Sequence, residues 1–262
     1  MPERDTVTTT RLPAMLLRLV AATMLASLLI APAGARLYGH IPYGEVAPAT
    51  LVAAPPGFAV GQPCRLQPAV LGDLTRMIGA ARAALPGSEL RGISCYRTVM
   101  HQDRVFCEAG RAGSPCVDPA SRAESVAPPG FSEHGTGYAI DFTARPESGC
   151  PDLDACFAMT AMGRWLIANA THYGFELSFP QGNAQGVTWE PWHWRWVGTS
   201  AAEPGARAAR AVFARARSQF PARPRVPAMA VRVMAQPPVP VPVAGANEAG
   251  AALPAEPQPH SP

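Results

Sequence analysis

The sequence predicts an α+β fold, because it combines two long helical segments with several short strands in an irregular order. The helical segments, 66–85 and 157–173, repeat apolar residues at helical spacing. Four short stretches have strand character, and they lie at 90–94, 136–143, 175–179 and 192–197. Strands and helices do not alternate regularly, so we expect no parallel sheet built from repeated strand–helix units.

Both predicted helices have recognisable ends. In the first, Pro68 suits the first turn and Pro86-Gly87 stops the helix. The second is expected to stop at Gly174. The apolar face of the first helix consists of Leu71, Leu74, Ile78, Ala81 and Leu85.

The N-terminus has the features of an export signal. Three arginines precede an apolar run from Leu19 to Ala31, which is shorter than the roughly 20 residues of a membrane-spanning helix. Pro32 breaks the run, and Ala33-Gly34-Ala35 has the A-x-A pattern of a cleavage site. We therefore expect residues 1–35 to be a signal peptide, with an uncleaved anchor as the alternative. Either would make this an exported protein of the periplasm or cell envelope.

Composition divides the rest of the chain into three parts. Residues 36–63 are rich in Pro, Gly and Ala and are expected to form a lead-in linker. Residues 64–200 contain the predicted helices and strands and form the expected domain. Residues 201–262 are expected to be an Arg-rich and then Pro-rich disordered tail, with a candidate Arg-rich helix at 203–220.

The charge distribution limits the expected partners. The net charge is +3, the chain has no Lys, and residues 201–236 hold seven Arg against one Glu. No basic face is interleaved with stacking aromatic residues, so we expect no nucleic-acid binding. The Arg-rich segment is either a solvated linker or an element that attaches the protein weakly to an anionic envelope surface, such as lipid head groups or wall polymers.

Six cysteines follow the expected signal peptide, and an even number is typical of disulfides in an exported chain. Short spacings favour Cys107–Cys116 and Cys150–Cys156, which leaves Cys64–Cys95, although spacing alone does not decide among the other pairings. A zinc–thiolate site is a weaker alternative, because the chain has no C-x-x-C.

Two motifs place histidines beside carboxylates: FSEHGTGYAID at 131–141 and WEPWHWRW at 189–196. His134, Asp141 and His193 together offer two imidazoles and a carboxylate. That set suits Zn²⁺ with one position left for water, and it suits Ca²⁺ or Mg²⁺ poorly, because these ions prefer oxygen ligands. The two motifs therefore predict a catalytic zinc site.

A fourth group, Glu190, lies three residues before His193. On a regular strand the two side chains would point to opposite faces. Pro191 is therefore expected to bend the chain between them. In the first motif, Gly135 and Gly137 are expected to allow a tight turn before Asp141 enters a strand.

Together these residues resemble the VanY-type zinc D-alanyl-D-alanine carboxypeptidases, whose superfamily also includes D,D-dipeptidases, phage-type endopeptidases and the hedgehog signalling domain. The resemblance covers residues 64–200. The main pattern is Ser132-x-His134-x-x-Gly137-x-Ala139-x-Asp141, followed by Glu190-Pro191-Trp192-His193-Trp194. Further matches are Ser94-Cys95-Tyr96-Arg97 with Gln102, Trp165-Leu166 with Asn169-Ala170, Tyr173-Gly174-Phe175, and Trp196-Val197-Gly198.

The resemblance implies a small antiparallel sheet with flanking helices and a zinc ion in a cleft. It also implies that this protein is a metallopeptidase. Its expected reaction is removal of the terminal D-Ala from peptidoglycan stem peptides that end in D-Ala-D-Ala, by attack of a zinc-bound water assisted by a glutamate. The implied roles are zinc ligands for His134, Asp141 and His193, general base for Glu190, carbonyl orientation for Arg97, and substrate binding for Ser132 and Gln102. The alternatives are an endopeptidase or D,D-dipeptidase of the same superfamily, or a zinc-stabilised wall-binding module without activity.

Overall fold

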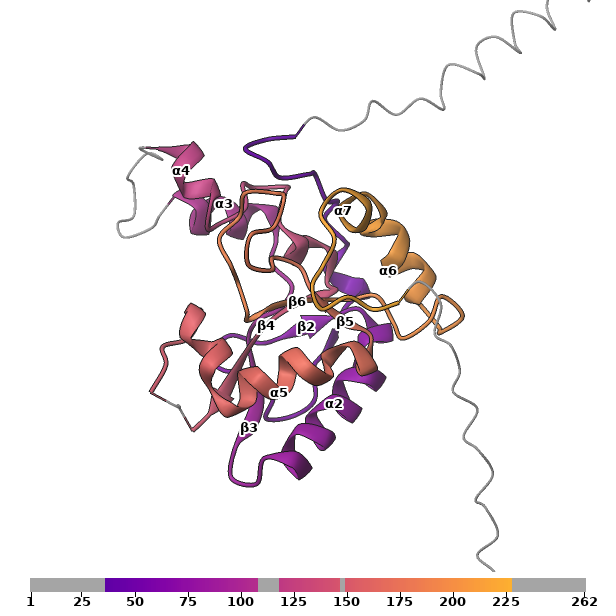
Figure 1. Cartoon of the computed structure of the whole chain (residues 1–262). Coiled ribbons are helices and arrows are strands. Elements are labelled where there is room, and N and C mark those ends of the chain that lie inside the picture. The colour runs from indigo at the N-terminus through magenta and orange to yellow at the C-terminus, as the bar shows by residue number, and fades with distance from the viewer. Residues whose placement is uncertain (1–35, 108–117, 147–148, 228–262) are drawn as a thin grey trace, which may run out of the picture. The chain divides into compact units, whose positions relative to one another are not determined.

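The computed structural model describes residues 36–107, 118–146 and 149–227 (Figure 1). Its centre is a four-stranded antiparallel sheet with the order β3-β4-β6-β5. A separate two-stranded ribbon joins β1 to β2. The strands are β1 Val52–Ala53, β2 Arg65–Leu66, β3 Glu89–Ser94, β4 Ala139–Arg145, β5 Phe175–Leu177 and β6 His193–Trp196. The α+β prediction is confirmed, and each of the four expected strands overlaps one strand of the main sheet.

The helices follow the predicted pattern with two differences. The α-helices are α2 Leu71–Ala84, α3 Val99–Cys107, α4 Pro119–Ala123, α5 Ala161–Asn169, α6 Ala206–Val212 and α7 Ala214–Gln219. The helix expected at 157–173 is divided, because Thr160 has an extended backbone and its side chain caps α5 by accepting a hydrogen bond from Gly163. The short helices α3 and α4 were not expected from the sequence.

Short 3-10 helices complete the architecture. They are η1 Pro48–Thr50, η2 Pro68–Val70, η3 Glu133–Thr136, η4 Ala155–Met159 and η5 Ala170–Tyr173. Two of them flank α5 and account for the remainder of the helix that the sequence predicts at 157–173. The third in chain order, η3, carries part of the first motif into the sheet.

The two faces of the main sheet differ in chemistry because side chains alternate along each strand. One face packs against α2 and α5, which lie together below the sheet in Figure 1, and its fully buried residues include Ile140, Phe142, Trp194 and Trp196. The opposite face carries Asp141, His193, Arg195 and Glu176, all of them buried. The strand HWRW thus contributes two tryptophans to the core and two polar side chains to the other face.

The lead-in expected to be a linker is instead packed against the domain. Ile41, Leu51 and Phe58 in this segment are almost fully buried. The backbone around Phe58 also pairs with the edge strand β3, through hydrogen bonds from Gly92 N to Phe58 O (3.0 Å) and from Val60 N to Gly92 O (2.8 Å). Gly92 permits this approach, since a Cβ there would lie 2.5 Å from the Phe58 ring.

The prediction of a disordered tail is also wrong for residues 201–227. The candidate helix at 203–220 is confirmed as two shorter helices, α6 and α7, and they bury one apolar face consisting of Ala206, Ala209, Phe213, Ala216 and Phe220. The average composition of 201–262 did not indicate this packing, because the Pro-rich stretch that follows dominates the segment. Residues 228–262 lie outside the described part of the chain.

The disulfides agree with the favoured pairing where it can be compared. Cys64 is bonded to Cys95, and Cys150 to Cys156. Cys107 is disulfide-bonded, whereas its expected partner Cys116 lies outside the described residues. The zinc–thiolate alternative does not hold for the two bonded pairs.

Across the described ranges, we find no helix that combines the length and the apolar character needed to cross a bilayer. The expected signal peptide, 1–35, lies outside those ranges.

Phe213→Ala is expected to lower the free energy of unfolding by about 3–5 kcal/mol, because it removes a fully buried aromatic ring and leaves a cavity. Urea unfolding followed by circular dichroism measures the change. Val212→Ala is the matched control: Val212 is 42% exposed, so its truncation should cost less than about 0.5 kcal/mol. Equally small effects in both variants would contradict the packing of α6 and α7 on the domain.

Candidate metal centre

Asp141 and His193 face each other across two adjacent strands. They are paired residues in the antiparallel register of β4 and β6, so their side chains emerge side by side on the same face. His193 Nδ1 lies 2.9 Å from Asp141 Oδ1. The sheet thus joins the two motifs, although 52 residues separate them in sequence.

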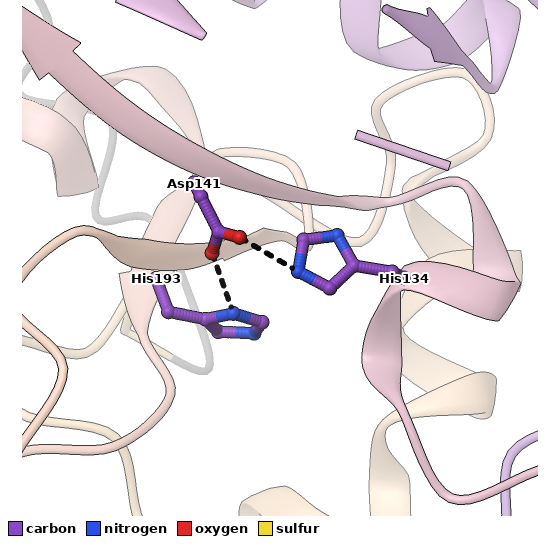
Figure 2. A group of neighbouring side chains, drawn as sticks. All are labelled: His134, Asp141 and His193. Atoms are coloured by element: carbon purple, nitrogen blue, oxygen red, sulfur yellow. Dashed lines mark hydrogen bonds and ion pairs between the residues drawn. The ribbon is translucent and has the colours of Figure 1, made fainter. Parts of the chain in front are cut away.

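His134 reaches the same point from η3. Ser132 caps this helix by accepting a hydrogen bond from the His134 N–H. Gly137 ends it in the left-handed region, with φ of 70°. His134 Nε2 lies 3.1 Å from Asp141 Oδ2, and Figure 2 shows the carboxylate between the two imidazole rings.

The three side chains fit a metal ion. Each offers one donor atom, and these atoms lie within 4.8 Å of one another. The second ring nitrogen of each histidine has its own partner: His134 Nδ1 lies 2.6 Å from the Cys95 carbonyl oxygen, and His193 Nε2 lies 3.1 Å from Glu133 Oε2. Such outer hydrogen bonds fix the ring orientation and leave the other nitrogen free for a metal, as in many zinc sites.

Glu190 approaches this group from a turn. The bend expected at Pro191 is present, with a hydrogen bond of 3.0 Å from His193 N to the Glu190 carbonyl. Glu190 Oε2 therefore lies 3.9 Å from His193 Nδ1, beside the three candidate ligands. Burial raises the pKa of Glu190 to about 8, and the adjacent carboxylates of Asp141 and Glu133 act in the same direction.

All seven residues assigned from the sequence line one cavity of about 360 Å³. Arg97 donates to Ser94 Oγ over 3.4 Å, while its buried Nε has no hydrogen-bond partner within the described ranges. Gln102 donates through Nε2 to the Ala127 carbonyl, and its buried Oε1 likewise has no partner there. Both groups have unused hydrogen-bonding capacity at the cavity that a substrate could satisfy.

One rim of the cavity belongs to a disulfide-bonded loop. Leu153, between Cys150 and Cys156, lines the cavity and is 46% exposed. His40 of the lead-in lines it as well, and its Nε2 lies 2.8 Å from the Ala123 carbonyl. The lead-in therefore contributes to the cavity wall, which the sequence did not indicate.

Glu133 is the main site residue that sequence reasoning missed. It is buried, and its carboxylate contacts His193 Nε2, Ser178 Oγ and Arg195 Nη1 at 3.1, 2.6 and 2.7 Å. The available signals were its place between Ser132 and His134 and the lone Arg195 between two buried tryptophans. A charged residue in such a strand indicates a buried ionic partner.

The buried charges determine the protonation of His193. Burial lowers its pKa, but the hydrogen bonds to Asp141 and Glu133 outweigh this effect and raise the pKa to about 10. Burial likewise opposes ionisation of Glu133, yet the charges of Arg195 and His193 hold its pKa well below the usual range. Without a metal, His193 is therefore protonated at neutral pH.

Two imidazoles, one carboxylate and an adjacent glutamate in a cavity form a donor set that could hold a metal ion, as in metal-dependent hydrolases. The chain belongs to the VanY family of D-alanyl-D-alanine carboxypeptidases, whose model matches residues 63–199.

Three similar proteins illustrate the family. YodJ of Bacillus subtilis (strain 168), named as a carboxypeptidase, is 38% identical over 134 residues, which are 50% of this chain and 45% of YodJ. The bifunctional D-Ala-D-Ala dipeptidase and D-Ala-D-Ala carboxypeptidase VanXYC of Enterococcus gallinarum is 30% identical over 51% of this chain and 67% of its own. The solved LdcB LD-carboxypeptidase aligns at a TM-score of 0.50 and 29% identity over 66% of this chain and 76% of its own. The chain thus spans less than half the length of YodJ.

Zinc affinity is expected to rise with pH between about 6.5 and 8.5. Because the pKa of His193 lies at about 10 without metal, Zn²⁺ must displace its proton throughout this range. One released proton gives about a tenfold gain in affinity per pH unit. Competition with a chelator of known proton affinity measures it, and an affinity that stays constant after correction for the chelator would contradict a protonated His193.

Proposed function

We propose that the protein is an exported zinc peptidase that removes the terminal D-Ala from peptidoglycan stem peptides ending in D-Ala-D-Ala. The observation that carries this proposal is the convergence of seven residues from distant parts of the sequence on one cavity. Membership of the VanY family supports the same reaction class. Export is supported by the signal-like segment 1–35 and by disulfides, which persist in oxidising compartments.

His134, Asp141 and His193 would hold the zinc ion. When bound, Zn²⁺ would supply activation of a water molecule and polarisation of the scissile carbonyl. Glu190, whose Oε2 lies 3.9 Å from His193 Nδ1, would take the proton from the attacking water and return it to the leaving amine. A divalent cation beside Glu190 would lower its raised pKa by favouring the carboxylate, so the base would be ionised in the loaded enzyme.

The remaining groups suit a substrate that carries a carboxylate and a peptide carbonyl. Arg97 can donate its unused Nε–H to the oxygen that gains charge during attack. The Ser132 hydroxyl accepts a hydrogen bond from His134 and keeps its own proton for a substrate carboxylate. Gln102 Oε1 can accept a hydrogen bond from a substrate N–H.

A pentapeptide stem ending in D-Ala-D-Ala is expected to lose one D-Ala when it is incubated with the full chain and Zn²⁺. Mass spectrometry of the products measures the loss, and a chelator provides the blank. Release of D-Ala-D-Ala or cleavage within the stem would favour an endopeptidase instead.

The same assay separates the other candidates. VanXYC acts, by its name, as both dipeptidase and carboxypeptidase, so free D-Ala-D-Ala is the second substrate. LdcB is named as an LD-carboxypeptidase, so a tetrapeptide stem ending in a single D-Ala is the third. Faster cleavage of either than of the pentapeptide would reassign the specificity. Binding of stem peptides without any cleavage would favour the non-catalytic wall-binding module.

Glu190→Gln is expected to retain zinc but to lose at least about 100-fold in turnover, because it removes the proton acceptor and leaves the three ligands intact. His193→Ala is the matched comparison, and it should lose the metal together with activity. Metal content by atomic spectroscopy and pentapeptide cleavage are measured on both. If Glu190→Gln loses its zinc or keeps full activity, the roles of base and ligand are assigned wrongly.

A further inference from the structure

A chain of buried ionic contacts begins at the outer nitrogen of His193. Glu133 Oε2 lies 3.1 Å from His193 Nε2, and Glu133 Oε1 accepts a hydrogen bond of 2.7 Å from Arg195 Nη1. The Tyr43 hydroxyl of the lead-in also donates to Glu133 Oε1, over 3.1 Å. Every oxygen of this carboxylate is thus engaged, and its orientation is fixed from two sides.

The chain continues from Arg195 to helix α7. Arg195 is paired with Glu176 across β6 and β5, and its Nε donates to Glu176 Oε1 over 2.9 Å. Arg217 Nε donates to the same oxygen over 3.0 Å. Arg195 also lies over the ring of Phe213, with its guanidinium carbon 5.3 Å from the ring centre.

This arrangement is buried along its whole length. Glu133, Arg195 and Glu176 are at most 3% exposed, and the side chain of Arg217 is 11% exposed. Two carboxylates and two guanidinium groups balance one another. Removal of Arg217 would leave the other three with one buried negative charge in excess, which is costly in a low-dielectric interior. Arg195 would then be the one guanidinium group shared between Glu133 and Glu176.

We propose that Arg217 is a positioning residue of the metal centre. It acts through Glu176, Arg195 and Glu133 to hold the His193 ring with Nδ1 toward Asp141 and His134. The inference rests on the proposed zinc site and extends it, because Arg217 lies beyond residues 63–199, the region that matches the family. Helices α6 and α7 would therefore be part of the functional domain.

Zinc affinity of the full chain tests this proposal without reference to peptide cleavage. Arg217→Met is expected to weaken Zn²⁺ binding by up to about tenfold, the lower end of the range for lost outer-shell partners of metal ligands, because three side chains lie between Arg217 and His193. Arg207→Met is the matched control, because Arg207 lies on α6 and is exposed. It should leave the affinity unchanged. Arg217→Lys keeps the positive charge and should recover most of the loss.

A double-mutant cycle separates positioning from general stability. Glu133→Gln removes the carboxylate through which Arg217 would act, so adding Arg217→Met to it should change zinc affinity by less than about twofold. Additive losses in the double variant, or an Arg217→Met variant that is less stable yet binds zinc like the wild type, would overturn the proposal. If Arg217→Met does not fold by circular dichroism, Glu176→Gln interrupts the same chain at its centre and is judged by the same criteria.

The wild-type protein keeps this test distinct from the proposed function. A wild type that binds no zinc would refute the metal site itself. A wild type that binds zinc and cleaves the pentapeptide, with Arg217→Met unchanged in affinity, would refute the role of Arg217 alone.

Discussion

The antiparallel pairing of Asp141 with His193 is the constraint on which the rest of the site depends. It fixes two candidate metal ligands on the polar face of the sheet, and it commits the alternate residues of both strands to the apolar core. A shift of one residue in this register would reverse both faces at once. The turn at Gly137 and the carbonyl of Cys95 orient the His134 ring toward the Asp141 carboxylate, whose position the sheet determines.

The polar face buries several charged groups beneath other parts of the chain, and their charges need oppositely charged partners nearby. Glu133 and Arg195 supply that compensation close to the ligands, and Glu176 extends it toward β5. Tyr43 of the lead-in and Arg217 of α7 complete this group of buried ionic contacts, through their hydrogen bonds to Glu133 and Glu176. A buried ionic layer of this kind contributes little net stability, so its value here lies in the orientation that it imposes on His193.

The sequence predicted the fold class and the helix α2, because regular apolar spacing is a local signal. It also predicted which residues meet at the cavity, since two motifs and a resemblance pointed to them. It did not predict the Cys95 carbonyl, because a backbone group leaves no mark in the sequence. It missed Glu133 because the burial of a charged residue depends on partners elsewhere in the chain. The helix around Phe213 was expected, but its packing against the domain was not, because averaged composition hid its apolar face.

Both edges of the main sheet are covered by chain that lies outside the motif-bearing region 64–200. Backbone around Phe58 pairs with β3, and the Pro224 carbonyl accepts a hydrogen bond from Leu177 of β5. Uncovered edge strands offer unpaired N–H and C=O groups on which other chains can assemble. The segments around Phe58 and Pro224 thus protect the sheet edges against edge-to-edge aggregation. A fragment cut to the motifs would keep every residue assigned to the metal site and still be prone to assemble into insoluble sheets.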